Sequence, residues 1–282
     1  MIHHKKDASG SLLKRLFLCT RKTLHLSLNS FICLTASTLP VWANTDCSSQ
    51  RYDETTSIRY IHDGDTLHLK DGRKVRLVGI NTPEVAHGDK TAEAFSKQAK
   101  DALKALFRDN KSISLVYGKE KQDRYERLLA HAFTHDGKNI QAVLLEQGFA
   151  RTITFPPNTR FSTCYKQQER KARCANVGLW KNTSLLTAKS IADEDIGFQL
   201  VKGRLNNIRI NKKGIWLNLD NKLTVGIRPD NQQLFDIDSI HKLKGKNVVV
   251  QGWLNKSKKQ TPYYMRIRHP SSLQSAESFA CD

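Results

Sequence analysis

The stretch from Asp63 to Glu84, DGDTLHLKDGRKVRLVGINTPE, decides the fold of the first half of this chain. Two runs of strand-forming residues flank the pair Asp71-Gly72, and Asp-Gly between such runs is a strong indication of a hairpin. A two-residue loop would place Leu67 opposite Arg76. Because side chains alternate along strands, Asp65 and Arg76 would then share one face, offset by one diagonal step.

Outward from this hairpin, the hydrophobic pattern predicts short strands mixed with three helices. Asn139 is expected to cap the second helix, because its side chain can accept a hydrogen bond from a backbone N–H of the first turn. Strands are expected at 57–62, 65–70, 73–80, 112–117 and 127–134, and helices at 90–107, 140–147 and 162–175.

The remainder of the chain has a different pattern. A polar and then acidic linker is expected at 182–196, followed by a separate small all-β segment. Five short strands with one irregular insert suit a small barrel. These strands are expected at 198–210, 214–219, 223–228, 247–254 and 263–268.

The composition points to a basic protein of two modest domains. The 282 residues carry a formal net charge of +19, and +14 remains when the first 43 residues are left out. A surplus of this size favours polyanionic partners such as nucleic acid or anionic lipid. The alternative is a basic surface that serves only solubility.

The N-terminus has the pattern of an export signal. Basic residues such as Arg15 and Lys22 precede an uncharged stretch from Leu24 to Ala43, where a small residue offers a cleavage site. The polar residues within the stretch make it a poor membrane span. The sequence therefore predicts a periplasmic or secreted protein without stable membrane insertion, and a retained anchor is the alternative.

Cysteine usage agrees with export. Four cysteines follow the leader: Cys47, Cys164, Cys174 and Cys281. An even number in an exported chain suggests disulfides. If 162–175 is helical, Cys164 and Cys174 lie about 15 Å apart along the axis and cannot pair. Full pairing would join each of them to Cys47 or Cys281, and free thiols remain the alternative.

Oxygen-bearing side chains near the hairpin predict a metal site. Asp65 is the expected first ligand, with the side-chain oxygen of Asn81 and the carbonyl of Thr82, which Pro83 holds extended. Hard cations such as Ca²⁺ take carboxylate, amide and backbone oxygens. Asp63 is expected to be an outer-shell or turn residue. Asp-Gly-Asp-Thr alone is more often only a turn.

The neighbouring charged residues predict hydrolysis of a phosphodiester. Glu84 can accept a proton from water, and Arg76 and Arg127 can neutralise charge on a phosphate. Tyr125 and Arg124 are expected to contact the substrate. Taken one by one, these side chains could also be a helix cap, surface charges and a partly buried tyrosine.

Residues 58–180 resemble the staphylococcal nuclease (thermonuclease) family. The resemblance implies a five-stranded OB-type barrel with three helices, and a calcium-dependent phosphodiesterase that cuts DNA and RNA and leaves 3′-phosphates. It implies Arg76, Glu84 and Arg127 as the catalytic residues, and Asp65, position 81 and Thr82 as the calcium ligands. The motifs that carry it are Asp63-Gly-Asp-Thr66, the run from Arg76 to Glu84, Asp123-Arg-Tyr-Glu-Arg127, Leu129-Ala-His-Ala-Phe133, Glu146-Gln-Gly-Phe-Ala150 and Gly178-Leu-Trp180.

The chain departs from this family at two places. Family members usually carry Asp where this chain has Asn81, and the loss of a negative charge should weaken calcium binding. The substrate-side tyrosines expected after Ala150 are not evident in the stretch 151–157. This second departure concerns the contacts to bases and not the chemistry.

The C-terminal segment resembles an OB-fold nucleic-acid-binding module in pattern. Its aromatic residues lie among many lysines and arginines, a combination on which single strands stack. The alternative is that these aromatics fill a small core. They are Trp216, Trp253, Tyr263 and Tyr264.

The expected fold class is α+β, a five-stranded OB-type barrel with three helices followed by a smaller OB-like all-β barrel. The expected function is an exported calcium-dependent nuclease of low sequence preference. A non-catalytic nucleic-acid-binding protein and a basic protein that binds anionic membranes are the alternatives. The expected parts are a signal peptide at 1–43, a polar lead-in at 44–56, a thermonuclease-like domain at 57–181, a linker at 182–196 and an OB-like domain with a tail at 197–282.

Overall fold

The computed structural model describes residues 47–86, 88, 91–181 and 185–281. The expected signal peptide and the first part of the lead-in lie outside these residues. All described residues belong to one compact unit. None of the helices within them combines the length and the apolar character needed to cross a membrane.

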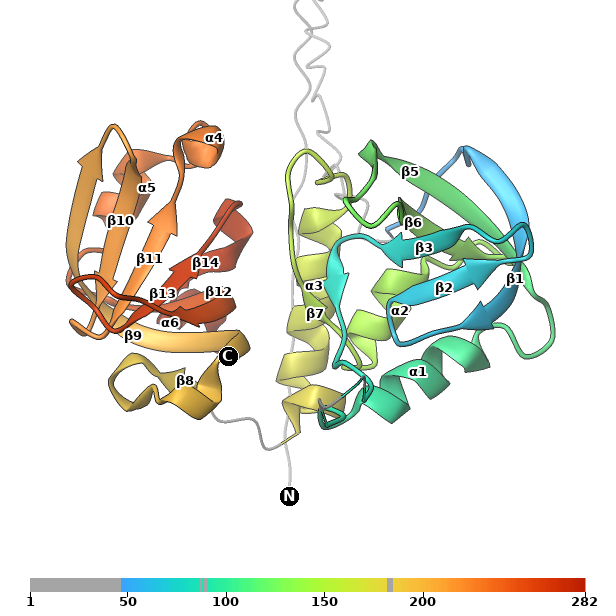
Figure 1. Ribbon diagram of the computed structural model, residues 1–282, viewed down its shortest axis with the longest axis horizontal. Helices are drawn as coiled ribbons and strands as arrows, with labels where there is room; N and C mark the ends of the chain where they lie inside the picture. The colour runs from blue at the N-terminus through green and yellow to red at the C-terminus, as the bar shows by residue number, and fades with distance from the viewer. Residues whose placement is uncertain (1–46, 87, 89–90, 182–184, 282) are drawn as a thin grey trace, which may run out of the picture. The chain divides into compact units, whose positions relative to one another are not determined.

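The first half forms a closed barrel with the strand order β1-β2-β3-β6-β5 (Figure 1). Neighbouring strands are antiparallel except β3 and β6, which run parallel. The expected five-stranded barrel is confirmed. The strands are β1 (Glu54–Ile61), β2 (Thr66–Leu69), β3 (Lys74–Leu77), β5 (Ser112–Gln122) and β6 (Leu128–Thr134).

Alternation along β2 and β3 decides which side chains face the site. Leu67, Leu69, Val75 and Leu77 are completely buried in the first hydrophobic core. The residues between them therefore point to the outer face of the barrel, and Arg76 is one of these. Outside the barrel, a short antiparallel ladder joins β4 (Ile80–Asn81) to β7 (Arg151–Thr152).

The register of the first hairpin differs from the expectation by one residue. Thr66, and not Leu67, pairs with Arg76, because the chain turns through a three-residue loop that ends at Gly72. Gly72 has φ of 94°, a value that this loop type reserves for glycine. Because β2 begins at Thr66, Asp65 lies in the turn before this strand. Its carboxylate reaches Arg76 from the preceding turn, so the expected proximity is correct although the expected register is wrong.

Helices cover the barrel in the expected order, but the first is shorter than the expected 90–107. The backbone N–H of Glu93 donates to the carbonyl of Glu84, and Phe95 has φ of 69°. These contacts draw the preceding residues toward the site loop, so the helix begins only at Ser96. Asn139 caps the second helix as expected. The helices are α1 (Ser96–Ala105), α2 (Ile140–Glu146) and α3 (Ser162–Cys174), followed by the 3₁₀ turn η1 (Gly178–Trp180).

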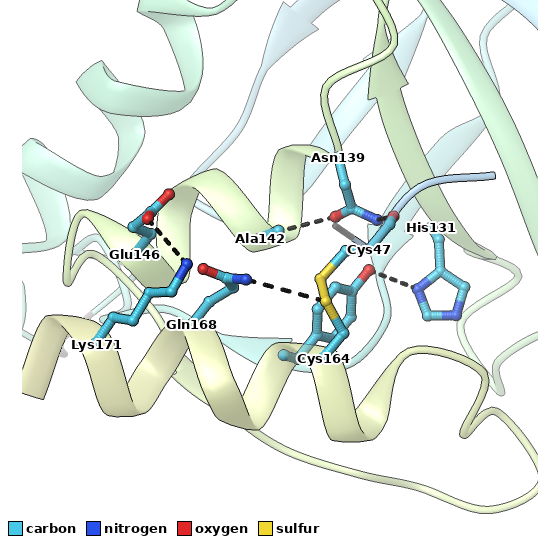
Figure 2. The surroundings of a disulfide bond; sticks show 9 residues. Cys47, His131, Asn139, Ala142, Glu146, Cys164, Gln168 and Lys171 are labelled. Carbon is cyan, nitrogen blue, oxygen red and sulfur yellow. Dashed lines mark hydrogen bonds and ion pairs between the residues drawn. A yellow bond between two sulfur atoms is a disulfide. The ribbon is translucent and has the colours of Figure 1, made fainter. Parts of the chain in front are cut away.

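Two disulfides connect α3 to distant parts of the chain. Cys47 pairs with Cys164 and Cys174 with Cys281, with Cα–Cα distances of 5.6 and 5.3 Å. The helix does keep Cys164 and Cys174 from pairing, as expected. Figure 2 shows the first bond, where Asn139 also donates to the Cys47 carbonyl at 3.0 Å and so fixes the lead-in against α2.

The second half forms another closed barrel in which β9, β10, β11, β13 and β12 follow one another and β12 pairs back to β9 (Figure 1). The expected second barrel is confirmed, with a core of aliphatic side chains such as Val201, Leu217 and Val250. The strands are β9 (Gly197–Asn211), β10 (Gly214–Leu219), β11 (Leu223–Ile227), β12 (Asn247–Lys256) and β13 (Tyr263–Arg266).

Short elements not expected from the sequence surround this barrel. The stretch expected as a linker contains β8, η2 and η3, and its Ala188 and Ile191 are buried in the second core. The irregular insert between β11 and β12 holds α4 and α5. The short elements are β8 (Leu186–Thr187), η2 (Ala188–Ser190), η3 (Asp193–Asp195), α4 (Pro229–Gln232), α5 (Ile237–His241), η4 (Pro270–Ser272), β14 (Leu273–Ser275) and α6 (Ala276–Phe279).

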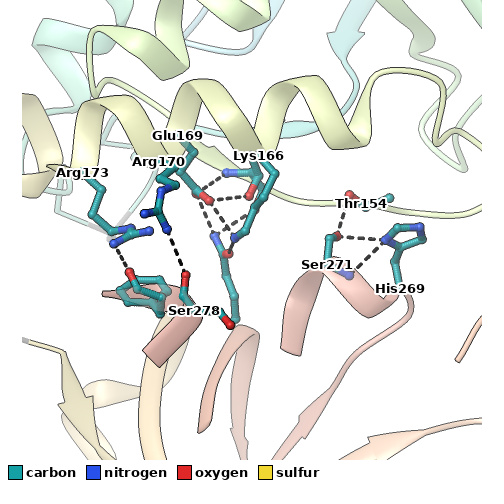
Figure 3. A network of polar contacts seen from close by, with 11 residues as sticks. Thr154, Lys166, Glu169, Arg170, Arg173, His269, Ser271 and Ser278 are labelled. Atoms are coloured by element: carbon teal, nitrogen blue, oxygen red, sulfur yellow. Dashed lines mark hydrogen bonds and ion pairs between the residues drawn. The ribbon is translucent and has the colours of Figure 1, made fainter. Parts of the chain in front are cut away.

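Buried polar contacts join the second barrel to α3 and β7 (Figure 3). Gln251 of β12 donates to the Thr152 carbonyl at 2.9 Å and to Glu169 at 3.3 Å. Glu169 also accepts hydrogen bonds from Thr152 and from Lys166. Nearby, Arg170 donates to the Ser278 carbonyl at 3.1 Å. These contacts and the Cys174–Cys281 bond make the second barrel part of the surroundings of β7.

Candidate active site

Most of the polar residues predicted for the site line one cavity of about 350 Å³. A larger cavity of about 920 Å³ shares several of these residues and extends past β2. The shared polar residues are Asp63, Thr66, Asn81, Glu84 and Arg127, while Asp65 and Arg76 line only the smaller cavity.

The Asp-Gly-Asp-Thr motif forms a tightly bonded turn. The backbone N–H of Asp65 donates to Asp63 at 3.0 Å, and the Asp65 carboxylate accepts from Thr66 Oγ1 and from the backbone N–H of Thr82. A Cβ atom at Gly64 would lie 2.8 Å from the side chains of Ala99 and Thr82, so only glycine fits. Asp63 therefore supports the turn that presents Asp65.

Asp65 is buried, with 3% of its surface exposed. Burial raises the pKa of its carboxyl group, and the guanidinium of Arg76 opposes this rise. The two groups form an ion pair of 3.0 Å. Arg76 also donates through Nη1 to the carbonyls of Leu77 and Ile80, at 2.5 and 3.0 Å. Its guanidinium is thus fixed at the cavity wall.

Arg127 is held by a residue that was not predicted as part of the site. Asp123 accepts from Nε of Arg127 at 2.8 Å and contacts Nη2 at 2.7 Å. The same carboxylate accepts from the backbone N–H groups of Tyr125 and Arg127. These contacts use one side of the guanidinium and leave Nη1 for another ligand. The i, i+4 spacing of Asp123 and Arg127 was the sequence feature that could have indicated this ion pair.

Glu84 and Asn81 come from the segment after β3. Asn81 ends β4, where pairing with Arg151 of β7 fixes its backbone. The backbone N–H of Glu84 donates to the side chain of Glu93 at 3.1 Å. The pKa of Glu84 is raised, because its carboxyl is partly shielded from water and lies near the negative charges of Asp65 and Asp63. A carboxylate with a raised pKa is a stronger base.

Tyr125 and Arg124 lie outside the walls of both cavities. Tyr125 is 62% exposed, and Arg124 donates to its hydroxyl at 2.6 Å. The guanidiniums of Arg124 and Arg127 lie 4.7 and 5.6 Å from the centre of its ring. The tyrosine therefore covers the outer side of Arg127.

The aromatic residues predicted for nucleic-acid binding in the second barrel separate into three places. Tyr263 is buried in the core. Trp216 and Tyr264 lie on neighbouring parts of the sheet, with ring centres 6.4 Å apart. Trp253 lines both cavities beside Glu84 and Arg127, together with Phe155 in the smaller one. No pattern in the sequence indicated that Trp253 would join the site of the first barrel.

The acidic and amide oxygens near Asp65 suit a weakly held hard cation. Within the described residues, no three His, Cys, Asp or Glu side chains form a metal-binding group. Of the expected ligands, the carboxylate of Asp65 and the neutral side chain of Asn81 line the smaller cavity, whereas Thr82 is buried and lines neither cavity. Asp63 and Glu84 add negative charge to the same cavity, and a cation would offset that charge.

Comparison with known proteins agrees with this geometry. Residues 74–182 match the family described as "Staphylococcal nuclease homologue", a segment that includes Arg76, Glu84 and Arg127. This segment of the chain is therefore similar to the staphylococcal nuclease family. The matched segment ends before the second barrel.

Relatives of this family cover similar lengths of the chain. It is 28% identical over 142 residues to "Thermonuclease" of Staphylococcus intermedius, an overlap of 49% of this chain and 81% of the relative. It is 30% identical over 130 residues to "Endonuclease YncB" of Bacillus subtilis (strain 168), or 44% of this chain and 61% of the relative. "Endonuclease YhcR" of the same organism is 35% identical over 135 residues, 44% of this chain and 11% of its own length.

Proposed function

We propose that this protein is an exported nuclease that hydrolyses phosphodiester bonds of DNA and RNA with calcium and with low sequence preference. The observation that carries the proposal is that Glu84 and two fixed arginines line one cavity of a staphylococcal nuclease-type barrel. The names of the relatives, thermonuclease and endonuclease, support the same activity.

The two arginines neutralise the phosphate. Arg76 is fixed by two carbonyls and Asp65, and Arg127 is fixed by Asp123, so neither loses much conformational entropy on binding. Their remaining N–H groups can donate to the phosphate oxygens, whose negative charge rises in the transition state. Contacts to phosphate carry little sequence information, so sequence preference should be low.

Glu84 acts as the general base. It takes a proton from the attacking water, whose oxygen forms a bond to phosphorus while the bond from phosphorus to the 5′-oxygen breaks. The departing 5′-oxygen takes up a proton from solvent water, so that the products are a 3′-phosphate and a 5′-hydroxyl. The raised pKa of Glu84 favours proton transfer to its carboxylate.

Asp65, Asn81 and Thr82 would hold the calcium ion. When bound, the ion supplies positive charge for the phosphate and for the acidic wall of the cavity. Because Asn81 is neutral, we expect weaker binding than with a carboxylate at this position.

Export is supported by the leader-like sequence and by the two disulfides. Disulfides form and persist in oxidising compartments such as the periplasm. The same proposal includes the division of the chain into parts. These are a signal peptide at 1–43, a polar lead-in at 44–56, a thermonuclease-like domain at 57–181, a linker at 182–196 and an OB-like domain with a tail at 197–282.

Degradation of plasmid DNA and of single-stranded RNA by the purified protein tests the function. We expect cleavage with calcium, little cleavage with a chelator, and products that carry 3′-phosphates. Binding without cleavage at any calcium concentration would favour the alternative, a nucleic-acid-binding protein made of two OB-type barrels.

A further inference from the structure

We infer that Trp253 of the second barrel, together with Phe155, forms a nucleobase subsite beside the phosphate-binding cavity. This inference rests on the proposed function. It assigns the second barrel a part in holding the substrate, through an unpaired base next to the phosphate that is cut.

Alternation along β12 explains why Trp253 reaches this cavity. Gln251 and Trp253 are two residues apart and therefore point to the same face of the strand. Gln251 is buried and bonded to Thr152 and Glu169. This anchor turns that face of β12 toward β7, so that the next side chain on the face, Trp253, meets Phe155 just after β7.

The two rings form a partly open aromatic ledge. Their centres lie 5.8 Å apart with an angle of 13° between the planes, and each residue is 38% exposed. Phe198 supports Trp253 edge-on at 4.9 Å, and the Arg268 guanidinium lies 4.8 Å from the centre of the Phe155 ring. The ledge is therefore fixed by its neighbours but keeps surface free for another ring.

The position of the ledge selects the ligand. Trp253 lines both cavities that also contain Glu84 and Arg127, so a ligand on its ring lies beside the groups expected to bind phosphate. A base attached to that phosphate can stack on the aromatic surface, and stacking is tolerant of base identity. The faces of a base are accessible only when its strand is unpaired at that point. The subsite therefore favours single-stranded nucleic acid.

Kinetics with two strands test the subsite. One is an ordinary single-stranded DNA oligonucleotide, and the other carries abasic residues around a single cleavable phosphate. We expect Trp253→Leu, which keeps an apolar side chain but removes the ring, to raise KM for the ordinary strand by about 5- to 150-fold, as the loss of one stacked base predicts. Trp253→Phe should restore most of the affinity. The abasic strand should not distinguish the variants from the parent.

Tyr52→Leu is the matched control, because Tyr52 is an aromatic residue of similar exposure, 40%, that lines neither cavity. Melting temperatures of all variants show whether the fold is retained. An unchanged KM for Trp253→Leu, or an equal loss on both strands, would overturn the inference.

A binding measurement separates this inference from the proposed function. Fluorescence of a single-stranded oligonucleotide that contains 2-aminopurine is recorded with a chelator, so that no cleavage is needed. We expect quenching by the parent protein and by Tyr52→Leu, and much weaker quenching by Trp253→Leu. If the parent cuts no substrate, the proposed function fails. Equal quenching by all three proteins would reject the subsite.

Discussion

At the scale of single residues, the chemistry depends on guanidinium groups that are fixed before the substrate arrives. Arg76 is bound to two carbonyls and one carboxylate, and Arg127 to one carboxylate that contacts it twice. Such preorganised donors stabilise developing charge without reorganisation during the reaction. Asp65 and Asp123 therefore support the arginines in addition to any other role.

Asp123→Asn should lower kcat more than it raises KM. The asparagine keeps the size of the side chain but loses the charge that holds Nε and Nη2 of Arg127, so the guanidinium becomes less well placed in the transition state. We expect a fall in kcat of about 10- to 100-fold. Steady-state cleavage of single-stranded DNA measures this. Asp136→Asn, which removes a comparable carboxylate paired with Lys138 away from the cavity, should leave kcat unchanged.

Asn81→Asp should strengthen calcium binding. A carboxylate at this position adds one negative charge to the proposed ligand set, and ligand charge helps to set calcium affinity. We expect the calcium concentration that gives half-maximal cleavage to fall by about 10-fold. Asn110→Asp adds the same charge at an exposed loop and should have no effect. An unchanged calcium requirement in Asn81→Asp would remove position 81 from the ligand set.

At the scale of elements, packing between β6 and α3 makes stability depend on pH. His131 of β6 is buried and contacts the Tyr165 hydroxyl of α3 at 2.8 Å. Burial lowers the pKa of His131 to about 3, and the positive charge of Arg160 adds to this effect. The folded state therefore holds the neutral imidazole, while the unfolded state binds a proton near pH 6.5.

His131 should consequently reduce stability as pH falls. Above about pH 6.5 the imidazole is neutral in both the folded and the unfolded state, so it does not change the free energy of unfolding. Between about pH 6.5 and pH 3 only the unfolded state binds the proton, and the free energy of unfolding falls by up to about 1.4 kcal/mol per pH unit. Urea unfolding at several pH values should show a smaller pH dependence for His131→Gln than for the parent. His135→Gln, at an exposed position, should behave as the parent does.

The sequence predicted elements well where they obey simple periodic patterns. The cap at Asn139 and the span of α3 were predicted closely, because capping and helical periodicity are local properties. The register of the β2–β3 hairpin was missed, because one extra loop residue shifts every pair without changing the pattern. The start of α1 was missed because a non-local contact between Glu93 and Glu84 competes with the helix.

The sequence also predicted most of the candidate site, but only from the first barrel. Short sequence motifs identified Asp65, Arg76, Glu84 and Arg127 as site residues, and all four line one cavity. Trp253 could not be placed in advance. Its position depends on how β12 packs against β7 and α3, and that packing leaves no short sequence motif.

At the scale of the whole molecule, the two barrels are linked by covalent and buried polar contacts. Cys174 at the end of α3 pairs with Cys281, across 107 residues of chain. The buried Glu169 would have a raised pKa from burial alone, but Lys166 and the Thr152 hydrogen bonds lower it overall. Glu169 thus remains a carboxylate that holds Gln251 in place.

Loss of the second disulfide should destabilise the protein. Closing a loop of about 100 residues restricts the unfolded chain, and removal of such a bond costs about 2–5 kcal/mol. We expect a Cys174→Ser and Cys281→Ser double variant to unfold at lower denaturant concentration by about this free energy. A reducing agent should lower the free energy of unfolding more in the parent than in the double variant. The parent then loses both disulfides, whereas the variant loses only Cys47–Cys164. Equal stability of parent and variant under oxidising conditions would contradict the structural role of the bond.

The central claim is that Glu84 acts within one cavity on a phosphate held by Arg76 and Arg127. Single-turnover cleavage of single-stranded DNA by Glu84→Gln, with DNA binding measured in parallel, tests it most directly. Glu120→Gln is the control, because Glu120 also lines the cavity but has no proposed role in catalysis. The account predicts a rate lowered by about 10²- to 10⁴-fold for Glu84→Gln, with DNA binding retained and with Glu120→Gln close to the parent. A Glu84→Gln variant that cuts DNA at the parental rate would contradict it.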